Sequence, residues 1–382
     1  MIPLESKLPS VGTTIFTVMT RLAEQHGAVN LSQGFPDFDP PQGLIERVEH
    51  YLRMRCHQYA PMPGVASLRA AIGQKLLDLY GVTVDPDSTI TVTSGATEAI
   101  FCAVQALVRP GDEVIVLDPC YDSYEPSVTL AGGRVVHVPL TLPRFGVDWE
   151  ALQASLNART RLVIINSPHN PSGALLNAFD LDRLAELLRP WRCYVLSDEV
   201  YEHVVFDGRP HATVLAQAEL AERSLAVFSF GKTYHATGWK LGYAVAPTAL
   251  SAELRRVHQY VTFASTSPLQ YALADFLSAH PEHHRALPQF YEQKRDYFCS
   301  LLAGTRLKFE PSAGTYFQLA DYSAVSDLSD GDFARWLTVE HGVATIPVSV
   351  FYDRPPAMRL VRFCFAKRPA TLDAAAERLA KL

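Results

Sequence analysis

The feature that most constrains the fold of this chain is a series of short apolar segments that alternates with helical patterns from residue 65 onward. These segments are rich in Val, Ile and Leu, and helix or turn signals separate most of them. A short, continuously apolar segment is typical of a strand that is buried on both faces of a parallel sheet. The segments that we expect to be strands are 88–95, 113–119, 134–140, 161–168, 193–198, 224–230 and 242–247.

Strands joined mostly through helices predict an α/β fold, with a three-layer αβα large domain around a mostly parallel seven-stranded sheet. Helices are expected at 251–262 and 282–303, and past residue 303 a mixed pattern predicts a smaller α+β domain. The first 40 residues, with "SQGFPDFDPPQG", suggest an irregular arm that packs on another part of the protein. The expected division is an arm and part of the small domain in 1–40, a ligand-binding large domain in 41–282, and a C-terminal small domain in 283–382.

Composition excludes several classes of function. The net charge of −6 and the lack of a basic tract argue against binding to nucleic acid or to an acidic membrane. Six well-separated cysteines without metal-ligand spacing suggest small buried side chains in a reducing compartment, and no metal site is expected. No apolar run approaches the ~20 residues of a membrane span, and the N-terminus does not resemble a signal peptide, so we expect a cytoplasmic protein.

Chemically capable side chains follow the predicted strands. Ligands of open α/β sheets bind beyond the carboxyl ends of the strands, so residues that are distant in the sequence are expected to meet there. Each of these residues alone also has an ordinary interpretation as a helix start, a turn, a cap or a packing residue. The candidates are Gly95, Ala96, Thr97, Tyr121, Asn170, Asp198, Tyr201, Ser229 and Lys232, with Lys240 shortly after.

Together these residues supply what one cofactor, pyridoxal 5′-phosphate, requires. Lys232 offers the amine for its aldehyde, and Asp198 offers the carboxylate that keeps its ring nitrogen protonated. Tyr121 offers an aromatic platform for the ring, while Asn170 and Tyr201 offer donors to its ring oxygen. Because Asp198 ends a strand, we expect it to lie outside the core.

The cofactor phosphate needs backbone donors at the N-terminus of a helix, and the amides of residues 95–97 fit this need. The hydroxyl of Ser229 and the cation of Lys240 add to them. This assignment explains why two of only eight lysines lie in "SFGKTYHATGWKLGY": one is the reactive amine and the other is a phosphate cation.

Seven blocks along the whole chain resemble one family. They are "NLSQGFPDF", "HQYAPMPGVASLRAAI", "VTSGATEAI", "DPCYDSYEP", "NSPHNPSG", "SDEVYEH" and "SFGKTYHATGWKLGY", and "RFCFAK" follows near the end. The chain resembles the class I aminotransferases of the fold-type I pyridoxal-phosphate enzymes. Within them it is most similar to bacterial methionine aminotransferases, and next to the kynurenine aminotransferase/glutamine transaminase K branch. Many members of the wider class carry arginine where this chain has Lys240, which keeps the charge but loses the bidentate fork.

The resemblance implies further roles. Arg362 would bind the substrate α-carboxylate with help from Asn170 and the backbone of Gly34, although an arginine at a strand edge is the alternative. Tyr59 would reach the cofactor phosphate of a neighbouring subunit, which implies a homodimer with shared active sites, although Tyr59 has packing as its alternative. We expect Lys294, Arg295 and the run 282–285 to form a solvated helix face.

The side-chain pocket is expected to be uncharged, because no arginine is found in the segment "YVTFASTSP" to pair a distal carboxylate. This predicts methionine as the best amino donor, with aromatic amino acids and glutamine behind it. Ala264 weighs against the kynurenine/glutamine branch, which tends to carry histidine at the matching position. The residues expected to line this pocket are Phe16, Phe35, Tyr59, Tyr121 and Phe263.

The implied reaction is ping-pong transamination between an amino acid and a 2-oxo acid. Lys232 is the expected base, with a pKa lowered by its surroundings, so His169 and His235 receive no role. The open alternatives are a kynurenine–oxoglutarate or glutamine–phenylpyruvate transaminase with cysteine-S-conjugate β-lyase activity, and a lyase as the main activity. A regulator built on the same fold would need a DNA-binding domain before residue 30, for which the sequence offers no segment.

Overall fold

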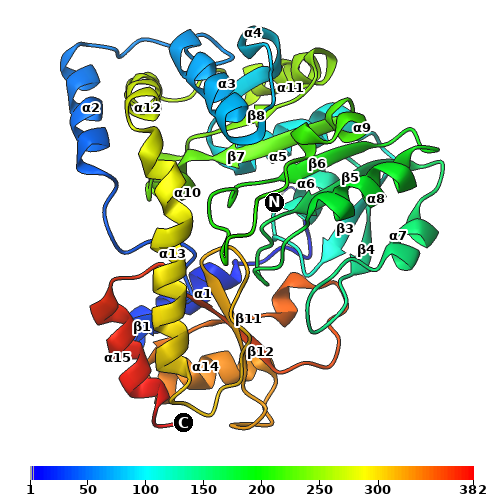
Figure 1. Ribbon diagram of the computed structural model, residues 1–382. Helices are drawn as coiled ribbons and strands as arrows, with labels where there is room; N and C mark the ends of the chain where they lie inside the picture. Colours follow the sequence, from blue (N-terminus) through cyan, green and yellow to red (C-terminus); the bar gives the residue numbers. More distant parts are fainter. Residues whose placement is uncertain (1, 3) are drawn as a thin grey trace.

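The computed structural model describes residues 2 and 4–382, and a seven-stranded mixed sheet forms its centre (Figure 1). The strand order is β2-β8-β7-β6-β5-β3-β4, and every pair is parallel except those that involve β8. All seven predicted strands are confirmed, and so is the mostly parallel sheet. Their bounds are β2 (Ile90–Thr93), β3 (Glu113–Asp118), β4 (Arg134–Pro139), β5 (Thr160–Asn166), β6 (Tyr194–Asp198), β7 (Ser224–Ser229) and β8 (Gly242–Val245).

Helices cover both faces of this sheet, which is why its strands are continuously apolar. On β3, Val114 and Val116 pack into the core beneath one helical layer, while Ile115 and Leu117 pack into the core on the opposite face. The first layer consists of α5 (Gly95–Leu107), α6 (Tyr124–Leu130) and α11 (Thr248–Val261). The second contains α2 (Gln42–Arg53), α3 (Ala66–Tyr80), α7 (Trp149–Ser155), α8 (Ala178–Leu188) and α12 (Ser267–Ala279).

A second body of structure is built on smaller sheets and has its own aromatic core. Strands β11 (Ile346–Pro347), β12 (Leu360–Cys364) and β9 (Phe317–Asp321) form an antiparallel sheet, and β1 (Val29–Asn30) pairs in parallel with β10 (Val343–Ala344). The long helix α13 (Pro281–Leu302) runs from the large sheet to these strands (Figure 1). The helices α14 (Asp330–Glu340) and α15 (Pro369–Leu379) flank them.

Short elements complete the chain. They are α4 (Pro86–Thr89), α9 (Ala218–Ala221), α10 (Phe230–Thr233), and the 3-10 turns η1 (Val214–Ala216), η2 (Thr237–Trp239) and η3 (Ser349–Phe351). Among the helices of the described residues, none combines the length and the apolar character that crossing a bilayer requires.

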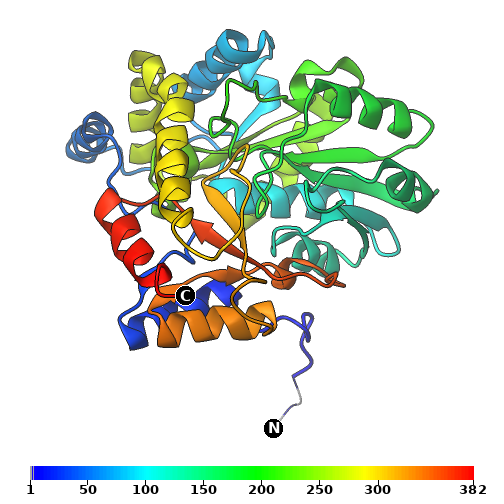
Figure 2. The same ribbon diagram turned by 60° about the horizontal axis from the view of Figure 1, so that its bottom comes forward.

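The expectation that the first 40 residues are irregular is wrong for α1 (Ile15–His26). Thr14 caps this helix by accepting a hydrogen bond from the backbone N–H of Thr17, and Gly27 ends it in a left-handed conformation. Its apolar face includes Met19, which is 1% exposed, and the helix packs beside α14 (Figure 2). The proline-rich segment that follows obscured this amphipathic pattern.

The expectation of a solvated face on α13 is also wrong in part. Arg295 is 4% exposed because Asp207 pairs with its guanidinium at 2.7 and 3.0 Å and the Ser312 carbonyl accepts a further bond. His284 is buried as well, and Lys294 donates to the carbonyl oxygen of Lys367. The helix lies between two bodies of structure, so charged residues on it become buried where partners are available.

Candidate active site

A cavity of about 180 Å³ lies beyond the carboxyl ends of β5, β6 and β7. The three strands are parallel, so their last residues meet at one edge of the sheet. Ten of the residues predicted from the sequence line this cavity: Gly95, Ala96, Thr97, Tyr121, Asn170, Asp198, Tyr201, Ser229, Lys232 and Lys240.

Lys232 lies on α10, the short helix that follows β7, and its amine is held by two oxygen atoms. Its Nζ donates to the carbonyl oxygen of Gly34 at 3.1 Å and to the hydroxyl of Tyr316 at 2.8 Å. Burial lowers the pKa of this amine to about 8, and the nearby cations Arg362 and Lys240 add to the effect. A substantial fraction of Lys232 is therefore neutral close to physiological pH, and in this form the amine can act as nucleophile or base.

Asp198 ends β6 and is 4% exposed, so the expectation that it lies outside the core is wrong. Its carboxylate accepts hydrogen bonds from the hydroxyl of Tyr124 at 2.6 Å and from the backbone N–H of Val200 at 3.3 Å. Among the described residues no side chain forms an ion pair with it. Burial raises the pKa of Asp198 to about 6, although the bond from Tyr124 opposes this rise.

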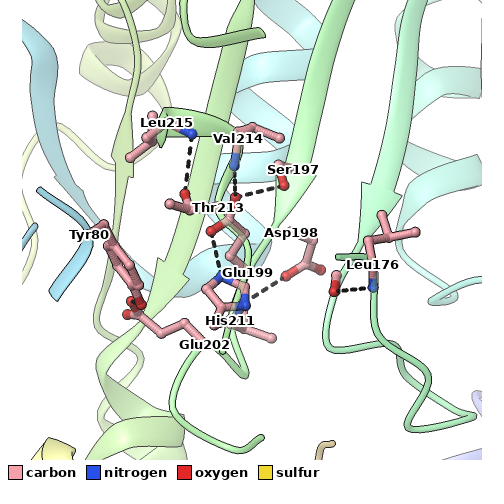
Figure 3. Close-up of polar contacts among 12 residues, drawn as sticks. Tyr80, Leu176, Ser197, Asp198, Glu199, Glu202, His211, Thr213, Val214 and Leu215 are labelled. Carbon is pink, nitrogen blue, oxygen red and sulfur yellow. Dashed lines mark hydrogen bonds and ion pairs between the residues drawn. The ribbon is translucent and has the colours of Figure 1, made fainter. Parts of the chain in front are cut away.

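The backbone that carries Asp198 is fixed by its neighbour, Glu199 (Figure 3). One carboxylate oxygen of Glu199 accepts bonds from the Ser197 hydroxyl at 2.9 Å and from the Val214 N–H at 3.1 Å. The other lies 2.8 Å from Nε2 of His211. On the other side, the side chain of Asn166 donates to the carbonyl oxygen of Asp198. These contacts fix the backbone from which the Asp198 side chain projects, and the bonds from Tyr124 and Val200 hold its carboxylate.

At another corner of the cavity, the N-terminus of α5 meets Lys240. Gly95 has a φ of +78°, and a Cβ built there would lie 3.5 Å from Cε of Lys240. Gly242 allows the close packing, because a Cβ at this position would come within 2.9 Å of the Ala96 nitrogen. Free backbone N–H groups at a helix N-terminus, next to a lysine, form an anion site suited to a phosphate.

Arg362 lies beside the cavity on β12 and is 1% exposed. Its guanidinium donates to Oδ1 of Asn170 at 2.7 Å and to the carbonyl oxygen of Ser32 at 3.2 Å, while its Nε has no protein partner. Burial lowers the pKa of Arg362 to about 10. The face of the guanidinium is 3.9 Å from the ring centre of Phe317. Arg362 is therefore a buried cation that is held in place by two hydrogen bonds and still has a free donor, Nε, for a ligand.

Besides Arg362, four predicted side chains do not line the cavity within this single chain. Phe16 is near the site, with its ring centre 5.4 Å from the Arg362 guanidinium carbon, and Phe35 is 44% exposed. Tyr59 and Phe263 are 85% and 41% exposed, and their rings pack edge to face with centroids 5.4 Å apart. These two residues therefore face outward as a pair.

Sequence reasoning missed Tyr124, Asn166 and Tyr316. The sequence gives little signal for them, because each acts through a contact with a residue far away in the chain. The only hint for Tyr124 is its position three residues after Tyr121, next to a predicted strand end.

Two groups of metal-ligand residue types also lie together. Glu98, Cys102 and His258 form one group, and Asp118, Cys120 and His137 form the other. Each contains a carboxylate–histidine contact of 2.8 or 2.9 Å, so these side chains satisfy one another's hydrogen-bonding groups.

The cavity has the chemical features that pyridoxal 5′-phosphate needs. It combines a buried carboxylate that lacks an ion-pair partner, an accessible lysine amine, and an anion site formed by a helix terminus and a second lysine. The model of the family "Aminotransferase class I and II" matches residues 26–379. The chain belongs to this family. Pyridoxal phosphate is the family's cofactor, so the enzyme is a pyridoxal-phosphate-dependent aminotransferase.

Curated relatives and solved structures agree with this assignment. The chain is 57% identical to the methionine aminotransferase of Escherichia coli, covering 99% of this chain and 98% of that one. It is 40% identical to a probable N-succinyldiaminopimelate aminotransferase of Mycobacterium tuberculosis (99% and 98% covered), and 35% identical to human kynurenine–oxoglutarate transaminase 3 (97% and 88% covered). A solved structure from E. coli, reported with a methionine aminotransferase function, superposes with a TM-score of 0.98 at 56% identity and covers 100% of both chains.

Proposed function

We propose that this aminotransferase transfers the amino group of methionine to 2-oxo acids, and that aromatic amino acids and glutamine are further donors. The observation that carries the proposal is the 57% identity to a methionine aminotransferase over nearly the whole chain. The aromatic rings of Phe16, Phe317 and Phe351 beside Arg362 support the same conclusion.

Within this proposal the residues of the cavity divide the work. Pyridoxal phosphate, when bound, withdraws electrons from the α-carbon of the amino acid and makes its proton acidic. Asp198 keeps the proton on the ring nitrogen, because an ionised buried carboxylate needs a positive partner. Lys232 holds the cofactor and then moves the proton at the α-carbon, which suits an amine with a pKa of about 8.

The remaining residues bind and orient. Residues 95–97, Ser229 and Lys240 would hold the phosphate, Tyr121 would offer an aromatic face to the ring, and Tyr201 would offer a donor to the ring oxygen. Arg362 binds the substrate carboxylate with Asn170 and the backbone of Gly34, which supplies orientation before any bond changes.

The groups around Arg362 favour an uncharged substrate side chain. The rings of Phe16, Phe317 and Phe351 have centres 3.9 to 5.4 Å from its guanidinium carbon. Sulfur packs well against aromatic rings, whereas an unpaired aspartate carboxylate in such surroundings costs several kcal/mol. Phe35 and Phe263 are proposed to complete this pocket.

We also propose that the working unit is a homodimer in which Tyr59 reaches the partner's phosphate site. The support is that Tyr59 and Phe263 pack together on the outside of the chain, whereas Asp198, Tyr201 and Arg362 are buried. The proposed domains are a pyridoxal-phosphate-binding part in 41–282 and a small part made of 1–40 with 283–382. Six free cysteines support a reducing, cytoplasmic location.

The test is a panel of amino donors assayed with one 2-oxo acid. We expect kcat/KM for methionine to exceed that for aspartate by at least about a hundredfold, because the side-chain carboxylate of aspartate would be buried without a positive partner. The panel includes kynurenine and N-succinyldiaminopimelate, because relatives named for these substrates are 35% and 40% identical. Preference for aspartate would disprove the uncharged pocket. Release of pyruvate and ammonia from a cysteine conjugate without an acceptor would favour the lyase alternative.

A further inference from the structure

The hydroxyl of Tyr316 touches the amine of Lys232, and none of the roles described above uses this contact. Tyr316 lies just before β9 and is fully buried. Its oxygen is 2.8 Å from Nζ of Lys232 and 2.6 Å from the carbonyl oxygen of Gly34, which is itself 3.1 Å from the same Nζ. Amine, hydroxyl and carbonyl therefore form a closed triangle of hydrogen bonds.

The directions of these bonds follow from the chemistry of the groups. The carbonyl of Gly34 has no proton, so the single hydroxyl proton of Tyr316 is donated to it. The hydroxyl oxygen is then free to accept from Lys232. A neutral amine has two N–H groups and one lone pair; when both N–H groups have fixed acceptors, the direction of the lone pair is fixed as well.

The Tyr316 ring is held firmly enough to act as such an acceptor. It packs against Tyr201, Phe317 and Tyr291 with ring centroids 5.1, 5.0 and 5.7 Å away. Tyr316 belongs to the aromatic core near the small sheets, whereas Lys232 follows a strand of the large sheet. The contact therefore links the reactive amine to the other body of the structure.

We infer that Tyr316 is a positioning residue: together with the Gly34 carbonyl it holds the free amine of Lys232 and aims its lone pair into the cavity. The inference rests on the proposed function, because it requires Lys232 to be the reactive lysine. It extends that function by naming what orients the base.

The contact also affects protonation. The charged and titratable groups that face Lys232 are Asp198, Arg362, Lys240, Cys364 and Tyr201. Acceptor oxygens stabilise an ammonium more than a neutral amine, so the Tyr316 hydroxyl opposes the effect of burial. Its removal should lower the pKa of Lys232 further and should also leave the amine less well oriented.

The experiment compares wild type, Tyr316→Phe and Tyr291→Phe. Tyr291 is a matched control, because it is also fully buried in the same aromatic cluster while its hydroxyl contacts His235 instead of Lys232. Cofactor-free protein takes up pyridoxal phosphate over a pH series, followed by visible absorbance. In wild type we expect uptake to rise with pH through about 8, as the amine loses its proton.

In Tyr316→Phe we expect the midpoint of cofactor uptake against pH to move to lower pH. The limiting uptake rate at high pH should fall about tenfold, because one hydrogen bond to a group that can carry charge is lost. In the loaded enzyme kcat should fall by a similar factor, with KM for the amino acid changed less than about threefold. Tyr291→Phe should match wild type in the midpoint, the limiting uptake rate, kcat and KM.

The outcomes separate the inference from the proposed function. If Lys232→Ala still forms the visible band and transaminates, the proposed function fails. If the wild type behaves as expected but Tyr316→Phe keeps the wild-type midpoint and kcat, only the inference about Tyr316 fails. Equal changes in both tyrosine variants would also overturn it, because any lost buried hydroxyl would then explain them.

Discussion

Burial acts on the two main ionisable residues of the site in opposite directions. It raises the pKa of Asp198 to about 6 and lowers the pKa of Lys232 to about 8. Both charged forms are disfavoured in the cofactor-free protein, so a ligand that pairs with the carboxylate and consumes the amine relieves both costs. The cofactor should therefore stabilise the fold as well as supply chemistry.

Asp198→Asn tests whether the buried charge of Asp198 destabilises the cofactor-free protein. A carboxyl whose folded pKa lies above its unfolded value adds stability below the unfolded pKa of about 3.8, and this is lost as pH rises through about 6. The difference between the folded and the unfolded pKa corresponds to about 3 kcal/mol of folding free energy. As pH rises from 4 to 7, the free energy of unfolding of the cofactor-free variant should therefore increase relative to wild type, by up to this amount.

The measurement is urea unfolding of cofactor-free wild type and variant at pH 4, 5, 6 and 7. Parallel stability curves would mean that Asp198 is already paired in the cofactor-free protein. With pyridoxal phosphate bound the variant should gain less stability than wild type, and its turnover should fall by about 10²–10³-fold, as for other strong electrostatic contacts in active sites.

At the scale of elements, the sequence predicted the large sheet well because its strands are buried on both faces. A strand such as 113–118 is apolar at every position except its ends, which few other structures allow. Helices α1, α2 and α12 were not predicted. The apolar positions of α1 follow a helical spacing, but its neighbours are proline- and glycine-rich, and this composition dominated the interpretation.

The candidate site was predictable where residues follow strand ends, and not where they act across the fold. Asp198 and Lys232 are found from strand order alone, since parallel strands end at one edge. Tyr124 and Tyr316 reach them from positions 74 and 84 residues away in the sequence. The burial of Arg295 likewise depends on Asp207, a residue 88 positions earlier, which no local pattern reveals.

Gly242→Ala tests the packing of α5 against β8. A Cβ at this position would lie 2.5 Å from the carbonyl oxygen of Phe228 and 2.9 Å from the Ala96 nitrogen, and both are backbone atoms. The helix N-terminus must move, which should destabilise the protein by about 1–3 kcal/mol and weaken pyridoxal-phosphate binding. Gly238→Ala is the control, because a Cβ there meets nothing within 4 Å.

Thermal unfolding and cofactor titration measure both effects. Unchanged cofactor affinity in Gly242→Ala, together with a lowered melting temperature, would show that the α5 terminus is not part of the phosphate site. Equal losses in both variants would instead point to backbone flexibility in the segment 238–242.

At the scale of the whole molecule, large apolar side chains are exposed on two segments of the large-sheet body. Tyr260 and Val261 at the end of α11 are 85% and 50% exposed, and Met54 after α2 is 63% exposed. Together with the outward-facing pair Tyr59 and Phe263, they give this part of the surface the composition of a protein interface. These residues support a dimer in which each chain completes the other's site.

Tyr260→Asp tests the dimer, because a carboxylate buried at an interface without a partner is costly. If the proposed dimer forms, the variant should sediment as a monomer at concentrations where wild type sediments as a dimer. Its kcat/KM should then fall at least about tenfold, because Tyr59 would no longer be supplied to the phosphate site across the interface. Phe179→Asp is the matched control: Phe179 is 84% exposed, but it lies on α8, at the right of Figure 1, far from α2 at the left. Full activity of a monomeric Tyr260→Asp variant would show that a single chain holds the complete site.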